Sequence, residues 1–327
     1  MDLVLNNNSS HVIEDVVVMK ANNKSGFIEA NTESVTLNHL RDECIIPVFS
    51  KDNESTISHF QFVDQTFQAV KSSFPGIKVN MPDIRVSHVI KGRIPSAIGK
   101  PAKELLDNEK TIYYERCAFL INIPDITSTV SGNKLTLSVG GVRSLNQENL
   151  YSRKSVEKFK IFIGYTNKVC TNLCVSTDGL CDDIRISSIS ELDERMEKLF
   201  NGYDFKQHLE ELNQMQNYVL NESQFAHLIG KIRMFQSMPK SEQHNIFKFN
   251  MNDSQITKMV KEYYNCPNFK RAENGSIDMW RVYNLLTEAN KSSYIDNYLE
   301  RSLCAFKFTR DLCNSLENER SNWFLNN

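Results

Sequence analysis

The sequence predicts an α+β protein: a largely antiparallel central sheet with an N-terminal helix, followed by an α-helical C-terminal region. Between residues 77 and 187, apolar and polar residues mostly alternate, and turn residues separate the runs. Just before this stretch and after residue 188, apolar residues recur instead at helical spacing. No repeat of fixed period is evident.

Residues 1–55 have the pattern of an N-terminal arm. Two hydrophobic patches, residues 12–19 and 44–49, lie among Asn, Ser and Glu residues, with a turn sequence between them. Such patches can add strands to a sheet or pack on another subunit. The arm therefore predicts a homo-oligomer as one possible assembly.

The N-terminal helix is expected over residues 57–70. Phe60, Val63, Phe67 and Val70 recur at helical spacing, and Pro75 follows with a glycine that ends the segment.

The strand predictions follow from alternation bounded by turn residues. Residues 111–123 form the clearest strand, which we expect to stop at Pro124, and residues 135–139 are its hairpin partner across a Ser-Gly-Asn-Lys turn. The remaining candidates are residues 79–89, a second hairpin of 158–165 and 169–177, and a short edge strand at 184–187.

After residue 188 the pattern becomes helical. Ser190 can cap a helix that runs to Phe200, because acidic residues occupy its first turn. Further helices are expected at 204–220, 223–236, 253–264, 276–289 and 293–318. We therefore predict an arm at 1–55, an α+β sheet domain at 56–187 and an α-helical region at 188–327.

The composition limits the class of protein. The 327 residues are 40% hydrophobic and 24% charged, with a net charge of −2, so any nucleic-acid surface must be a local patch. No apolar run is long enough to cross a bilayer, and the N-terminus lacks the pattern of a secretory signal. Eight cysteines spread along the chain favour a reduced, cytoplasmic protein. We expect no membrane association.

Residues 132–168 form a basic segment. Seven basic residues face two acids, Glu148 and Glu157, which gives a local charge of +5. In the predicted strand, Lys158, Lys160 and Phe162 share one face and the intervening apolar residues share the other. Cations beside an aromatic ring suit a polyanion with stackable bases, although lysine on a strand face also protects sheet edges from aggregation.

The candidate nucleic-acid-binding residues lie in this segment and the polar loop before its strand. Basic side chains would contact phosphates, and the aromatic rings would stack on bases. The residues are Arg143, Tyr151, Arg153, Lys154, Lys158, Lys160, Phe162, Tyr165 and Lys168.

A second charged stretch has the opposite sign. Residues 178–222 hold eleven acids against four basic residues, a balance of −7. A solvated helix face explains this composition, and an acidic wall that docks another protein is the alternative.

Motifs for metal and catalytic chemistry are weak. Cys170, Cys174 and Cys181 lack the paired spacing of a zinc site, so small buried side chains are the better interpretation. Gly140-Gly141 precedes an arginine without a phosphate-loop frame and favours a bend where a strand ends. The candidate carboxylates of a metal-dependent nuclease, Asp125, Asp178, Asp182 and Asp183, have unremarkable spacing. We expect no cofactor, no metal and no enzymatic activity.

Aromatic residues also recur near the C-terminus. Trp280 and Tyr283, and then Tyr294 and Tyr298, are spaced as on one helix face. This spacing favours packing between helices over a ligand cage.

Three stretches, residues 140–164, 169–179 and 280–290, resemble an uncharacterised family of gut-bacterial genomes and mobile elements, domain of unknown function 3871. More distantly, the chain resembles phage- and plasmid-like proteins of unknown function. There a GxRxxN pattern precedes a strand and a CxN pattern follows it; Arg143 and Asn146 match the first, Cys170 and Asn172 the second. The resemblance implies a mobile-element context, in which replication and recombination functions are common, and carries no catalytic residues.

The leading hypothesis is a non-enzymatic, nucleic-acid-binding accessory protein of a phage, plasmid or integrative element, with single-strand DNA binding or annealing as one form. A protein-interaction module, either an assembly subunit or an inhibitor of host defence, is the alternative, supported by the arm and the acidic helices.

Overall fold

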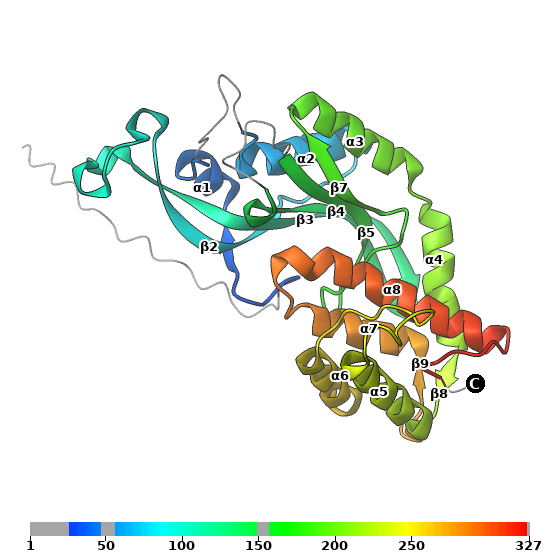
Figure 1. The fold of residues 1–327 in the computed structure, drawn as a ribbon. Coiled ribbons are helices and arrows are strands. Elements are labelled where there is room, and N and C mark those ends of the chain that lie inside the picture. The colour runs from blue at the N-terminus through cyan, green and yellow to red at the C-terminus, as the bar shows by residue number, and fades with distance from the viewer. Residues whose placement is uncertain (1–25, 47–55, 149–156, 326–327) are drawn as a thin grey trace, which may run out of the picture.

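A computed structural model describes residues 26–46, 56–148 and 157–325. Its centre is a seven-stranded sheet in which every strand pair is antiparallel, in the order β1-β2-β3-β4-β5-β6, with β7 also paired to β5. The helices of the C-terminal region follow this sheet, so the predicted α+β class is confirmed (Figure 1). The strands are β1 (Glu33–Val35), β2 (Asp83–Arg93), β3 (Lys110–Val130), β4 (Asn133–Ser144), β5 (Glu157–Asn167), β6 (Leu173–Cys174) and β7 (Leu180–Ile186).

The longest strand departs from the prediction. β3 continues through Pro124 to Val130, and its pairing with β4 shifts register between Ile123 and Thr127. Proline cannot donate to a ladder, and an irregularity of this kind accommodates it. The hairpin turn agrees with the prediction, because Ser131 and Gly132 both have positive φ, as the tight turn of a right-twisted hairpin requires.

One face of the sheet is covered by α2 (His59–Ser73) and α3 (Ile189–Gly202), which lie side by side (Figure 1). Ser58 and Gln61 form a capping box that starts α2 two residues later than predicted. Phe62 on α2 then packs its ring against Phe119 and Phe159, with centroids 5.1 and 4.7 Å away. This contact joins α2 to the centre of the main core.

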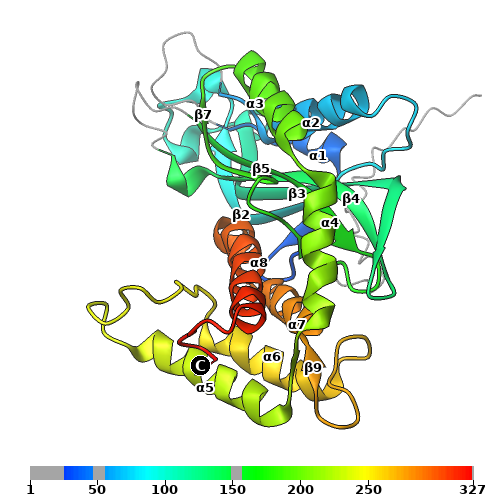
Figure 2. The same ribbon diagram turned by 90° about the vertical axis from the view of Figure 1, so that its right-hand side faces the viewer.

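The opposite face is covered by α8 (Ile295–Glu317), with α7 (Met279–Asn290) beside it (Figure 2). Ile295, Tyr298 and Leu299 of α8 pack on Phe162 in a second apolar cluster. The arm enters the same cluster, because Phe27 and Ile28 are buried there before β1 joins the edge of β2. The patch at residues 12–19 lies outside the described residues.

The C-terminal helices form the rest of the molecule (Figure 2). They are α4 (Phe205–Gln214), α5 (Glu222–Ser237) and α6 (Asp253–Asn265) in addition to α3, α7 and α8, and the short α1 (Leu37–Asp42) lies in the arm. The helix predicted over 204–220 ends at Gln214, and a short ladder of β8 (Val219–Leu220) with β9 (Ile277–Asp278) follows. No helix in the described residues is long and apolar enough to cross a membrane.

Candidate nucleic-acid interface

Basic residues from three strands lie on the α8 side of the sheet. Lys158 pairs in register with Arg185, Lys160 with Val142, and Arg116 with Ser144. Paired residues share a face, and successive residues alternate. One face therefore carries Arg116 on β3, Lys158 and Lys160 on β5, and Arg185 on β7, which we call the basic strip.

The basic strip is partly accessible to solvent because α8 begins beside it and packs on the neighbouring apolar residues instead. The neighbouring apolar residues of this face, Val142 and Phe162, are buried against Ile295 and Tyr298 in the first turns of α8. Beyond this contact the sheet is less covered: Lys158 and Lys160 are half-buried and Arg185 is exposed. The lysines thus lie at the boundary between the second apolar cluster and solvent.

The two lysines keep their charge available. Within the described residues no carboxylate lies within 4.0 Å of either ammonium group, the distance that defines an ion pair. Asp183, a carboxylate that the charges of both lysines influence, pairs with Arg185 at 2.9 Å. The hydrogen bond from Arg185 lowers the pKa of Asp183, and the charges of Arg185, Lys158 and Lys160 lower it further. The field of the strip is therefore positive.

Arg116 connects the strip to the start of α8. Its Nε donates to Oδ1 of Asp296 at 2.6 Å, and Oγ of Ser144 donates to the same oxygen at 2.8 Å. Nδ2 of Asn146 donates to the other carboxylate oxygen at 3.2 Å. Asp296 thus receives donors from three segments, which fixes the first turn of α8 at the end of the strip.

Two aromatic residues expected to stack on bases are buried, which corrects the expectation. Phe162 is 0% exposed beneath α8. Tyr165 is 2% exposed on the opposite face, where its ring lies 5.7 Å from that of His208. Alternation placed Phe162 beside the lysines correctly, but it carries no information about the helix that covers that residue.

Arg143 is also buried rather than available to a phosphate. Its guanidinium donates to both carboxylate oxygens of Glu148 at 3.0 and 3.1 Å and to Glu157 at 3.1 Å, and it also bonds the carbonyl of Ile57. It stacks 4.6 Å above the ring of Phe159. The two acids of the basic segment are therefore both partners of the buried Arg143.

The remaining predicted residues are dispersed. Lys168 is exposed, but ten residues of extended chain, about 33 Å, separate it from Lys158. It therefore does not belong to the basic strip. Tyr151, Arg153 and Lys154 lie outside the described residues.

Comparison with known proteins places the chain in a family. The model described as domain of unknown function, B. Theta Gene description, matches residues 6–325. The chain belongs to the DUF3871 family. No curated protein matches it, and no solved structure matches it either.

In this DUF3871 chain the GxRxxN and CxN motifs attach loops of the sheet to the C-terminal helices. Asn146 binds Asp296 of α8, as described above. Asn172 donates through Nδ2 to the carbonyl of Asn284 on α7 at 3.0 Å, and the carbonyl of Cys170 accepts from Lys291. Both motifs therefore have packing roles in this structure.

The glycine pair lies within β4 rather than at a bend. A Cβ on Gly140 would lie 2.1 Å from the carbonyl oxygen of Phe119 and 2.8 Å from the ring of Phe162. One on Gly141 would lie 2.6 Å from the ring of Phe62. The glycines therefore let aromatic rings approach the strand from both faces, and they do not form a phosphate loop.

The cysteines and carboxylates of the DUF3871 chain also have structural surroundings. Burial raises the pKa of the Cys170 and Cys174 thiols to about 12, which favours the neutral thiol over a metal-binding thiolate. Asp178 accepts from Ser176 and from the backbone of Asp204 at 2.6 and 2.8 Å. Within the described residues no group of three His, Cys, Asp or Glu residues could hold a metal ion.

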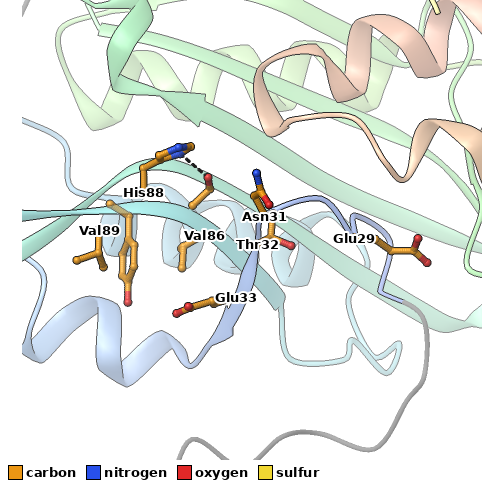
Figure 3. A pocket seen from close by; sticks show the side chains of 9 residues that line it. Glu29, Asn31, Thr32, Glu33, Val86, His88 and Val89 are labelled. Carbon is orange, nitrogen blue, oxygen red and sulfur yellow. Dashed lines mark hydrogen bonds between the residues drawn. The ribbon is translucent and has the colours of Figure 1, made fainter. Parts of the chain in front are cut away.

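A hollow of about 410 Å³ lies between β2 and the segment around β1, and its lining includes His88 and Val89 together with Asn31, Thr32 and Glu33 (Figure 3). His88 has φ of 61°, and Nη1 of Arg116 donates to its Nδ1 at 2.6 Å. The lining includes Glu29 and Glu33 but no lysine or arginine. The hollow therefore suits a phosphate less well than the basic strip does.

Proposed function

We propose that this DUF3871 protein is a non-enzymatic nucleic-acid-binding protein that contacts phosphates through the basic strip. The observation that carries the proposal is the position of Lys158 and Lys160: both are half-buried beyond the part of the sheet that α8 covers, and neither forms an ion pair within the described residues. Lysines held on a strand with unneutralised charge are suited to phosphate contacts, which supply most of non-specific affinity.

The shape of the strip favours an extended polyanion over a small anion. The strip crosses β3, β4, β5 and β7, three inter-strand steps of about 4.8 Å, and so extends over roughly 14 Å. Its cations follow a line across the sheet instead of converging on one point. Successive phosphates of a nucleic-acid strand match such a line.

The biological setting extends the proposal. We place the protein in the cytoplasm as an accessory of a phage, plasmid or integrative element, in which single-strand binding or annealing is the specific form. The resemblance to mobile-element proteins supports this setting. Phe162 and Tyr165 are buried, so neither ring supports base stacking.

The test is fluorescence anisotropy with a labelled oligonucleotide over a series of salt concentrations. We expect the unchanged protein to bind at low salt and Lys158→Glu/Lys160→Glu to bind much more weakly. With a single-stranded oligonucleotide, the magnitude of the slope of log K against log salt should decrease by about 0.7 for each lysine that is replaced.

Lys261→Glu/Lys270→Glu is the matched control, because it makes the same charge change at exposed lysines of α6 and the loop after it. Equal loss of affinity in both variants would show a net-charge effect, and no binding by the unchanged protein at low salt would refute the proposal.

The second candidate is a protein-interaction module that assembles through the arm. The favouring observation is that the arm already supplies β1 to the sheet edge and Phe27 to the second apolar cluster. Residues 1–25 precede this anchored part. Deleting them should lower the mass in solution if the arm joins subunits, and an unchanged mass would refute arm exchange. A deletion to residue 50 would be uninformative, since it removes Phe27 and Ile28 from the core.

A further inference from the structure

Tyr294 is an exposed aromatic residue next to the basic strip. It directly precedes α8, and 51% of its surface is accessible, unlike the buried Phe162 and Tyr165. Among the described residues, no ring contact involves Tyr294. The spacing of Tyr294 and Tyr298 predicted packing for both, but only Tyr298 packs, at 2% exposure against Phe27.

The residues that follow Tyr294 fix its place in the fold. Ile295 is 1% exposed in the second apolar cluster, and Asp296 is bonded to Arg116 and Ser144. The ring of Tyr294 is thus carried on a backbone that is held to the sheet within two residues. Ser144 lies one inter-strand step from Arg116, and β5 with Lys158 is one step further, about 10 Å in all.

We propose that Tyr294 stacks on an unpaired base of a strand whose phosphates contact Lys158 and Lys160, so that the site takes single-stranded nucleic acid. This inference rests on the proposed function. Tyr294 is an exposed ring two residues before Asp296, which bonds Arg116 of the basic strip, and the strip carries unneutralised lysines on the same face. Together they offer both contacts that single-strand binding uses, stacking and phosphate attraction.

A duplex cannot make the same pair of contacts. Its base faces are covered by neighbouring bases, so an aromatic ring reaches them only after unstacking, at a cost of a few kcal/mol per step. The lysines would still attract duplex phosphates. Tyr294 therefore determines specificity, whereas the basic strip determines affinity for any nucleic acid.

The tyrosine hydroxyl offers a different contact, a hydrogen bond to phosphate. Tyr294→Phe separates the two, because it keeps the ring and removes the hydroxyl. Stacking predicts that Tyr294→Phe binds as the unchanged protein does, while Tyr294→Ala does not.

The experiment measures anisotropy with two labelled polymers of equal length, an unstructured single-stranded DNA and an abasic strand that has the same phosphates. We expect Tyr294→Ala to weaken DNA binding by about five- to 150-fold, the range for one base–aromatic stack. Abasic-strand binding should stay within about twofold. Tyr264→Ala, at a tyrosine of α6 that is 49% exposed, is the control and should change neither affinity.

The outcomes separate the two proposals. If the unchanged protein binds DNA and Lys158→Glu/Lys160→Glu weakens it, but Tyr294→Ala binds normally, the stacking inference is overturned and the proposed function stands. Equal weakening by Tyr294→Ala for DNA and the abasic strand also overturns it. If the unchanged protein binds neither polymer at low salt, both proposals fail.

Discussion

Arg143 and Lys158 carry the same charge in the same basic segment, yet the sheet gives them opposite surroundings. Arg143 lies on the face that α2 covers and is 0% exposed, whereas Lys158 lies on the other face, beyond the start of α8. The burial of Arg143 is tolerable because Glu148 and Glu157 supply partners at hydrogen-bond distance. At the residue scale, a basic side chain therefore indicates a function only when the sheet face that carries it is known.

Replacing Arg143 should destabilise the fold severely. Arg143→Met leaves the carboxylate of Glu148 buried without the cation that pairs with it, which costs about 3–5 kcal/mol. Denaturant unfolding at pH 7 measures the loss. Arg185→Met is the control, since its side chain is 57% exposed and its pair lies at the surface; that change should stay within about 0.5 kcal/mol. A loss below about 1 kcal/mol for Arg143→Met would contradict the assigned role.

Two buried histidines should make the protein less stable in mild acid. Burial lowers the pKa of His59 and of His208 to about 3, and each ring has a buried nitrogen without a hydrogen-bond partner in the described residues. The unfolded chain, with imidazole pKa near 6.5, binds more protons below that pH. The contribution of the two neutral histidines to the free energy of unfolding is therefore largest above about pH 6.5 and declines as the pH falls toward 3.

Between pH 6.5 and 5 each histidine should contribute a loss of about 1.6 kcal/mol. Urea unfolding at several pH values measures the slope. His208→Gln should flatten the slope, whatever its effect at pH 7, and His244→Gln at an exposed position should leave it unchanged. A slope that is identical in His208→Gln and the unchanged protein would contradict this prediction.

At the element scale, β4 depends on its glycines. Gly141→Ala would bring a methyl group to 2.6 Å from Cζ of Phe62, and such overpacking costs about 1–3 kcal/mol. Gly230→Ala on α5 has no atom within 4 Å of the added carbon and should stabilise by up to about 1 kcal/mol, because alanine favours a helix. Thermal unfolding distinguishes the two. Equal shifts for both variants would show that close approach at β4 is unimportant.

The elements themselves were largely predictable, and the causes of the errors are physical. Alternation located β4 and β5, and helical spacing located α5, α6 and α8, because these signals are local. The continuation of β3 past Pro124 was missed, since the register shift that accommodates the proline depends on the partner strand. In the candidate site, the shared face of Lys158 and Lys160 followed from alternation. The burial of Phe162 under α8 and the ion pair of Arg116 with Asp296 could not be predicted, because each joins residues that are far apart in sequence.

At the scale of the whole molecule, the sheet has a helical layer on each face, and both layers draw on the C-terminal region. The face with Phe162 is covered by Ile295 and Tyr298 of α8, and the opposite face by α2 together with Leu192 and Met196 of α3. The boundary at residue 188 falls between β7 and α3, in the middle of this layered arrangement. A sequence boundary there need not separate two independently folding units.

We therefore expect residues 56–187 not to fold alone. Without α8 and the arm, the apolar face that includes Leu120, Val142 and Phe162 is left bare, and an apolar patch of this kind leads to association instead of a stable monomer. The fragment should aggregate or show poorly dispersed amide resonances, whereas residues 26–327 should unfold in one cooperative transition. A monomeric 56–187 fragment with a dispersed amide spectrum would contradict this expectation. It would also mean that α8 docks on a sheet that is already folded, so the opening of the basic strip could vary without unfolding the strands that carry it.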